Sequence, residues 1–322
     1  MVFFITALRA LAAILITNAH YTDVYPVSII ASGGLLGDVL FFAVSGYCLS
    51  NIRTGFLPWY GKRLMRVYPP VLLITLIYML LGFYRLGEWN LAQWYLYPTY
   101  YHFVASIIVL YIPYYFVAKY VKSRKQLLAV AGAVLAVWVL AYAFGYDKSR
   151  YHIDTVREPM IRFLFFEAML MGLYFKRFQR PGSTNRGKRC LSFLLLFALI
   201  VLYFATKLLF SRRASLAPWQ LLNQFVLLAL LYSVFSHMSR TEGWLHRLPA
   251  GVWKAVSFLA GLTLEIYLVQ YVVIEQLAKA APFPLNWLIV TGVILLAAFA
   301  LQWLNSAVVK GAERIIGRMR KA

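Results

Sequence analysis

The first apolar stretch, "FFITALRALAAILITNAH" at residues 3–20, decides the fold and contains two side chains that do not suit lipid. It is about long enough to cross a bilayer as a helix, which takes roughly 17–25 mainly apolar residues. Arg9 nevertheless lies inside it and His20 closes it. A charge at the bilayer centre costs about 3 kcal/mol or more unless it faces protein or water. The segment is therefore predicted to be a membrane helix with one polar face.

The composition of the whole chain points to a membrane protein. Of its 322 residues, 62% are hydrophobic and only 13% are charged, and the mean hydropathy is +0.70. Soluble domains usually carry about 25% charged residues. The net charge of +21 would suggest nucleic acid in a soluble protein, but membrane proteins collect basic residues in their cytoplasmic loops. We expect membrane lipids around the chain and no nucleic-acid partner.

Apolar runs long enough to span a bilayer recur along the whole chain. They are continuous rather than alternating, which favours helices over the strands of a barrel. The expected fold is an all-α polytopic membrane protein of about ten transmembrane helices, forming a single membrane-embedded domain over residues 1–322. The first run is expected to be a retained helix, because no charged leader precedes it. The ten runs are 3–20, 32–50, 67–84, 101–118, 126–146, 159–175, 191–210, 220–237, 255–276 and 287–308.

The distribution of lysine and arginine gives an orientation. If the N-terminus is inside, the inner segments carry 22 of these residues and the outer segments carry 7. Positively charged residues accumulate on the cytoplasmic side of membrane proteins. The asymmetry predicts that both termini lie in the cytoplasm.

Arg9 and His20 are eleven residues apart, which is about three helical turns and roughly 16 Å along one face. In the predicted orientation Arg9 lies toward the cytoplasm and His20 toward the outer surface. Arg9 alone could extend to the inner headgroups, and a histidine at a helix end could be interfacial. The pair on one stripe, in a chain with five histidines, favours a functional interpretation.

The sequence around this pair resembles the acyltransferase-3 family, whose members are integral membrane enzymes that O-acylate sugars of envelope and secreted polysaccharides. The resemblance begins with the R-x10-H spacing of Arg9 and His20 and extends from one end of the chain to the other. Similar motifs are "GGLLGDVLFFAVSGYCLSN" (33–51), "WYGKRLMRVYPP" (59–70), "HFVASIIVLYIPYYF" (102–116) and "LTLEIYLVQYVVI" (262–274).

Two positions depart from the family pattern. Some members have a glutamate in the fourth-helix motif, where this chain has only Ser106, Ile107 and Ile108. Many members have a histidine after Ile-Tyr-Leu-x, where this chain has Gln270. A base from either place is therefore doubtful, which leaves His20 as the leading candidate.

The family resemblance implies an acyl-coenzyme A donor, acetyl-coenzyme A or another short acyl thioester, arriving from the cytoplasm as a co-substrate. We expect no bound cofactor and no metal. His20 suits the role of general base, because the pKa of an unperturbed histidine is about 6.5. Arg9, Arg63 and Arg66 are the candidates to bind the donor phosphates, since a guanidinium matches phosphate geometry. Arg63 and Arg66 share a face if their helix begins early enough; the alternative for them is the ordinary cytoplasmic bias.

Four further residues complete the predicted site. Asp38, inside the second apolar run, is a catalytic candidate that could orient His20 or pair with Arg9; the alternative is helix packing aided by neighbouring glycines. Asp23 could hold the His20 imidazole or bind acceptor, or be an ordinary loop carboxylate. Tyr101 and His102 end an aromatic segment that could stack on sugar rings, although aromatic belts at membrane interfaces have the same composition.

Together these observations predict a membrane O-acyltransferase in the bacterial plasma (inner) membrane. It would move an acetyl or other short acyl group to a hydroxyl of a cell-surface or exported glycan at the outer face. The alternative is a transporter or flippase for a glycan or lipid-linked sugar, in which the same polar residues line a path without chemistry.

Overall fold

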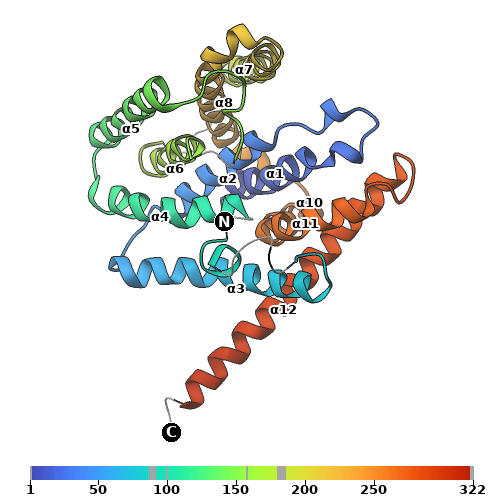
Figure 1. Cartoon of the computed structure of the whole chain (residues 1–322). Coiled ribbons are helices and arrows are strands. Elements are labelled where there is room, and N and C mark those ends of the chain that lie inside the picture. Colours follow the sequence, from blue (N-terminus) through green and yellow to red (C-terminus); the bar gives the residue numbers. More distant parts are fainter. Residues whose placement is uncertain are drawn as a thin grey trace. The chain divides into compact units, whose positions relative to one another are not determined.

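The computed structural model describes residues 2–85, 87, 92–98, 101–156, 159–179 and 186–319 (Figure 1). Within these ranges the chain is helical and contains no strand. The apolar runs become helices because a helix satisfies its own backbone hydrogen bonds where water is absent. The helices are α1 (Phe3–Ala19), α2 (Gly34–Leu49), α3 (Phe56–Leu80), α4 (His102–Tyr120), α5 (Arg124–Gly145), α6 (Ile161–Phe178), α7 (Arg186–Arg212), α8 (Gln220–Arg240), α9 (Glu242–Leu245), α10 (Ala250–Gly261), α11 (Thr263–Leu277) and α12 (Leu285–Met319).

All ten predicted runs are helical, and the chain is an all-α polytopic membrane protein. In the described part, seven helices are long and apolar enough to cross a membrane, and the bent pair α10 and α11 makes an eighth if it is one span. The first run, α1, has 17 residues and is shorter than each of these seven helices. The sixth run, α6, has 18 residues but carries four charged ones.

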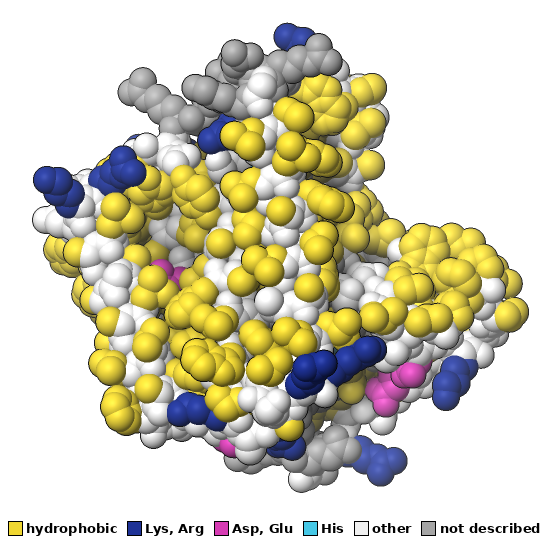
Figure 2. Space-filling view, turned by 90° about the horizontal axis from the view of Figure 1, so that it is seen from above, with side chains coloured by type: hydrophobic (Ala, Val, Ile, Leu, Met, Phe, Trp, Pro, Cys, Tyr) yellow, Lys and Arg dark blue, Asp and Glu magenta, His cyan; other side chains and the backbone are white. Residues whose placement is uncertain are grey.

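Several expected bounds differ in the structure; among them, the last helix, α12, continues to Met319 instead of ending at 308. The third helix begins at Phe56 rather than at 67, because lysine and arginine are good helix formers and the basic segment extends the helix before its apolar part. The ninth run is not one straight helix, since α10 and α11 meet at a bend of 69°. Figure 2 shows a face dominated by hydrophobic side chains with few charged ones, as lipid contact requires.

The chain divides into two compact units. Unit 1 comprises Met1–Ala12, Leu35–Arg53 and Val109–Ser257, and unit 2 comprises Ala13–Gly34, Thr54–Ile108 and Phe258–Ala322. The boundary between the units falls within α1, so this helix contributes to both. The single domain over residues 1–322 stays a prediction.

In unit 1, α2 and α6 pack with their backbones in close contact. A Cβ added to Gly46 would clash with the Met169 carbonyl, and one added to Gly172 would clash with the Ala43 carbonyl. Small residues allow this approach between membrane helices. The guanidinium of Arg177 donates hydrogen bonds to carbonyls at the C-terminal ends of α2 and α4, namely Val121 at 2.6 Å, Ser50 at 2.9 Å and Ala118.

In unit 2, the end of α1 packs with α3, α11 and α12. Figure 1 shows α12 as the long orange-red helix beside α11. Ala13 and Tyr21 of the α1 region join a buried apolar cluster that includes Val71, Ile266 and Ile294 from the three other helices. This cluster fixes the end of α1 that carries His20.

The beginning of α1 is held in unit 1 by a carboxylate. Glu242 accepts hydrogen bonds from the backbone N–H groups of Phe3 at 2.8 Å and Phe4 at 2.7 Å. These N–H groups have no partner inside the helix, and the helix dipole favours a negative charge at this end. Glu242 is therefore an N-terminal cap supplied from a distant part of the sequence.

Replacing Glu242 with alanine should lower the free energy of unfolding by about 1 kcal/mol, because both N–H groups lose their acceptor. The matched control is Glu275→Ala, which removes an exposed acid at the end of α11. Thermal unfolding followed by circular dichroism in detergent would measure both changes. Equal melting temperatures for the two variants would contradict the capping role.

Candidate functional site

Arg9 lies in the first half of the first helix, and His20 lies directly after its end. Arg9 is half-buried within α1, and His20 follows the last residue of the helix, with its N–H donating to the Thr17 carbonyl at 3.0 Å. Ala13 and Ile16, which lie between them on the same stripe, are 3% and 6% exposed. The stripe is therefore covered by protein along its middle. The His20 side chain itself is exposed.

The His20 ring contacts an aromatic residue of α11. Its centroid lies 6.4 Å from that of Tyr271, and the two planes are perpendicular. One turn earlier in α1, Thr17 donates a hydrogen bond of 2.7 Å to the side-chain oxygen of Gln270. Thr17 and Gln270 are both buried, and Gln270 is only 1% exposed. The position where many family members have histidine thus serves here to join α11 to α1.

The start of α4 contacts α11 at Tyr267, one turn before Tyr271. Tyr267 precedes Tyr271 by four residues, so both lie on one face of α11. The Tyr267 hydroxyl accepts a hydrogen bond from the Phe103 N–H at 3.3 Å, and its ring lies 6.3 Å from that of Tyr101. His102 lies between Tyr101 and Phe103 in the sequence and is half-buried. The structure thus places the backbone of His102 and the ring of His20 near adjacent turns of α11.

Tyr101 belongs to the core of unit 2. Its side chain is 4% exposed, and its hydroxyl pairs with that of Tyr84 at 3.0 Å. Tyr84 in turn stacks on Trp94, with ring centroids 4.8 Å apart. This arrangement supports a packing role for Tyr101 more strongly than direct stacking on a sugar.

Arg63 and Arg66 both lie within α3, because the helix begins at Phe56. Arg63 is half-buried and its guanidinium lies 5.4 Å from the ring centroid of Trp59. The Arg63 Nε atom is buried and makes no hydrogen bond within the described part of the chain. Arg66 is exposed. Of the two, Arg63 has the more restricted guanidinium.

The two candidate aspartates have different surroundings. Asp38 is buried on α2 in unit 1, with 8% of its side chain exposed. Asp23 lies in unit 2, in the 3-10 turn Tyr21–Asp23 that follows His20, and is exposed. Asp23 therefore shares a unit with His20, whereas Asp38 shares one with Arg9.

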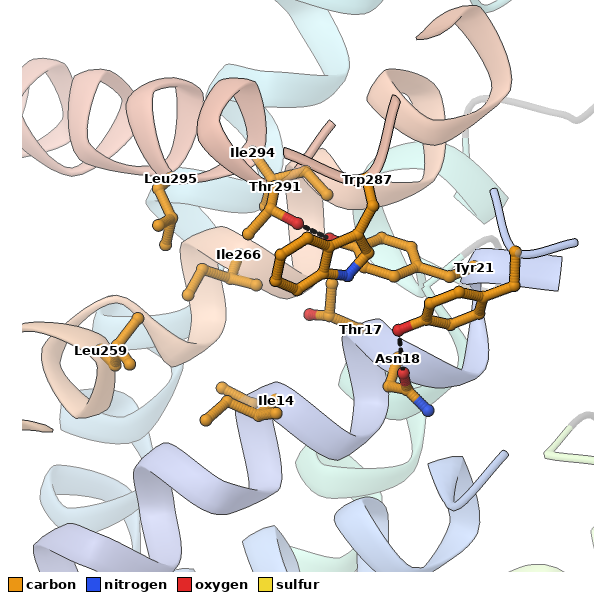
Figure 3. A pocket seen from close by; sticks show the side chains of 12 residues that line it. Ile14, Thr17, Asn18, Tyr21, Leu259, Ile266, Trp287, Thr291, Ile294 and Leu295 are labelled. Atoms are coloured by element: carbon orange, nitrogen blue, oxygen red, sulfur yellow. Dashed lines mark hydrogen bonds between the residues drawn. The ribbon is translucent and has the colours of Figure 1, made fainter. Parts of the chain in front are cut away.

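A pocket of about 360 Å³ lies in unit 2 beside the end of α1 (Figure 3). Its walls come from α1, the turn after it, α10, α11 and α12. The lining residues nearest to His20 in sequence are Asn18 before it and Tyr21 after it, and His20 itself is not part of the lining. The lining residues are Ala13, Ile14, Thr17, Asn18, Tyr21, Tyr25, Leu259, Ile266, Trp287, Thr291, Ile294 and Leu295.

Most hydroxyl and amide groups around the pocket are paired with one another. The Tyr21 hydroxyl lies 2.9 Å from the Thr291 hydroxyl, and the Tyr25 hydroxyl donates to the Asn18 carbonyl at 2.7 Å. The Asn18 amide donates to the backbone carbonyls of Ile30 at 2.9 Å and Ser32 at 3.0 Å. The polar wall is thus preformed.

A family model described as an acyltransferase domain, that of the acyltransferase-3 family, matches residues 2–304. The chain belongs to the acyltransferase-3 family. The match covers nearly the whole chain, so the protein is a multi-pass membrane acyltransferase. It does not favour the transporter alternative. No curated protein and no solved structure matches the chain.

Several residues of this candidate site were missed by the sequence reasoning. Tyr267 and Tyr271 lie in the late family-like motif, and their spacing of four residues was a signal that they share a face. Trp287 and Thr291 gave no comparable signal, because they look like ordinary parts of an apolar run. Only the tertiary packing of α12, in which Thr291 meets the Tyr21 hydroxyl, brings them to the pocket.

The Thr17–Gln270 hydrogen bond offers a test of the site geometry. Gln270→Leu should lower the free energy of unfolding by about 1–3 kcal/mol, because the buried Thr17 hydroxyl loses its acceptor. Adding Thr17→Val should restore much of that loss, since replacing both partners by apolar groups can be nearly neutral. A double-mutant cycle on melting temperatures measures the coupling. Additive losses would show that the two side chains do not interact.

Proposed function

We propose that this acyltransferase moves an acetyl or other short acyl group from acyl-coenzyme A to a hydroxyl of a cell-surface or exported glycan. His20 acts as the general base. The observation that carries the proposal is the position of His20: it is exposed at the end of α1, its ring contacts Tyr271, and a pocket begins at the next residue.

The proposed reaction is a direct transfer. The acceptor hydroxyl donates its proton to the His20 imidazole while its oxygen attacks the thioester carbonyl carbon. A carbon–oxygen bond forms and the carbon–sulfur bond breaks. The coenzyme A thiolate leaves and takes the proton from the imidazolium, which restores neutral His20. The products are an O-acyl ester and free coenzyme A.

The donor is proposed to lie along α1, with its phosphates at the cytoplasmic end. Arg9 is eleven residues before His20 on a continuous helix, a separation close to the reach of an extended pantetheine arm. Arg63 and Arg66 add two guanidinium groups on α3. The unpaired, buried Nε of Arg63 supports an anion as its partner, because buried donors are rarely left without one.

The orientation supports the same arrangement. The excess of lysine and arginine in alternate connections favours both termini in the cytoplasm, where coenzyme A is found. The glycan would then meet His20 at the outer face of a bacterial inner membrane. His102 is the second histidine to consider near the acceptor, and Asp23 remains a proposed acceptor-side residue. Tyr101, which is buried in the core, would shape that region without touching the acceptor. Asp38 remains a proposed catalytic residue, with helix packing as its alternative role.

His20→Ala should reduce acyl transfer by at least about a hundredfold, since a positioned general base contributes roughly 10²–10⁴-fold. The assay is transfer of radiolabelled acetyl from acetyl-coenzyme A to glycan in membranes. His152→Ala is the matched control, because His152 lies in unit 1 in a loop and its ring stacks on Tyr146. His102→Ala tests the second histidine. Full transfer by the His20 variant would refute the base assignment.

Arg63→Ala should raise the KM for acetyl-coenzyme A by about tenfold and leave kcat nearly unchanged, because a phosphate contact binds ground state and transition state alike. Arg53→Ala, which removes an exposed arginine, should change neither constant. Initial rates across a range of donor concentrations separate the two effects. A fall in kcat at saturating donor, with KM unchanged, would contradict the phosphate role.

A further inference from the structure

The pocket lined by Tyr21, the residue after His20, is larger than the smallest acyl group needs. We infer that it binds the alkyl chain of an acyl group longer than acetyl, so that the residues of its apolar end limit the length of the transferred chain. This inference rests on the proposed function, because it places the acyl carbonyl beside His20. The inference specifies the donor as an acyl-coenzyme A whose acyl chain is longer than acetyl.

The pocket has a polar end and an apolar end. Figure 3 shows Tyr21 and Asn18 at one end and Ile14, Leu259 and Leu295 at the other. Tyr21 immediately follows His20 in the sequence, so the polar end adjoins the turn that carries the proposed base, although His20 itself does not line the pocket. An acyl group with its carbonyl at His20 would therefore extend its chain toward Ile14, Leu259 and Leu295.

The hydrogen bonding of the pocket fits an alkyl chain better than a sugar. The Tyr21, Tyr25 and Thr17 hydroxyls already have partners, and a sugar would need several unpaired donors and acceptors. The Trp287 indole belongs to the lining and adds an aromatic wall to the pocket.

The size of the pocket also favours a longer chain. Its volume of about 360 Å³ is within the range of pockets that hold whole small ligands, which begin near 300 Å³. An acetyl group has two carbons and would leave most of this space empty. Each additional buried methylene should strengthen binding by about fourfold.

An alkyl chain has a route into the pocket from the membrane. Ile14 lines the pocket and is 52% exposed, so the apolar end reaches the surface of the protein.

The bend between α10 and α11 also lies at the pocket. Leu259 and Ile266 stand on either side of this 69° bend. At that bend the Gly261 carbonyl accepts a hydrogen bond from Gln302 at 3.1 Å. Non-helical backbone within a membrane is tolerated where it lies in protein or lines a cavity.

The test compares chain-length selectivity in two variants of the full-length protein. Ile14→Trp places a large ring at the apolar end, and its exposed position makes it compatible with folding. The matched control is Leu11→Trp, a similar change at an exposed position of α1 outside the pocket. We expect the ratio of kcat/KM for octanoyl-coenzyme A to that for acetyl-coenzyme A to fall at least tenfold in Ile14→Trp only. An unchanged ratio in both variants, with transfer present, overturns the pocket assignment alone.

A binding experiment keeps the inference testable without turnover. Octanoyl-coenzyme A with a photoreactive diazirine at the chain end is cross-linked to the His20→Ala variant, and labelled peptides are identified by mass spectrometry. Labelling of the Ile14, Leu259 or Leu295 segments supports the inference, and competition by unlabelled octanoyl-coenzyme A should remove it. Labelling confined to other helices, or no labelling, overturns it. Absence of transfer from every acyl-coenzyme A in the wild type would instead count against the proposed function.

Discussion

The proposed site depends on the fixed position of α1. A helix in lipid cannot rely on water to satisfy exposed polar groups, so its ends and its polar side chains must find partners in the protein. Glu242 provides them at the beginning of α1, and Gln270 provides one near its end. The helix is therefore held at both ends by hydrogen bonds from residues more than 230 positions away in the sequence. The roles proposed for Arg9 and His20 require that the helix that carries them is held in this way.

The position of α11 has a comparable importance for the surroundings of His20. Three consecutive turns of this helix supply Ile266 and Tyr267, Gln270 and Tyr271, and Ile274. Its residues contact the start of α4 through Tyr267, α1 through Gln270, and the His20 ring through Tyr271. The bend that separates it from α10 lies next to the pocket. One irregular span thus organises much of the site within unit 2.

Much of the fold could be predicted from the sequence, because hydrophobicity along a membrane protein is a strong and nearly local signal. All ten apolar runs are helical, and the family resemblance carried by Arg9, His20 and the motif around Asp38 agrees with the family match. The bend between α10 and α11 was not predicted, since Gly261 lies in an otherwise continuous apolar run. Hydropathy does not indicate the early start of α3, because the first turns of this helix are basic and only its later part is apolar.

The surroundings of the site were harder to predict, because they depend on which helices meet. The sequence indicated His20 itself but not Tyr271 beside it, and it indicated Gln270 only as a departure from the family pattern. The pocket could not be predicted, since Trp287 and Thr291 are brought to α1 by tertiary packing alone. Tyr101 shows the converse: its aromatic segment suggested a sugar platform, whereas the structure places this residue in the core.

The most direct measurement is a cryo-EM structure of the protein bound to a non-transferable thioether analogue of acyl-coenzyme A. The account predicts that the nucleotide phosphates lie at the Arg9 end of α1. The carbon that replaces the carbonyl should lie within about 6 Å of the His20 imidazole, which leaves room for one hydrogen-bonded hydroxyl between them. An analogue bound against other helices, with its thioether remote from His20, would contradict the account.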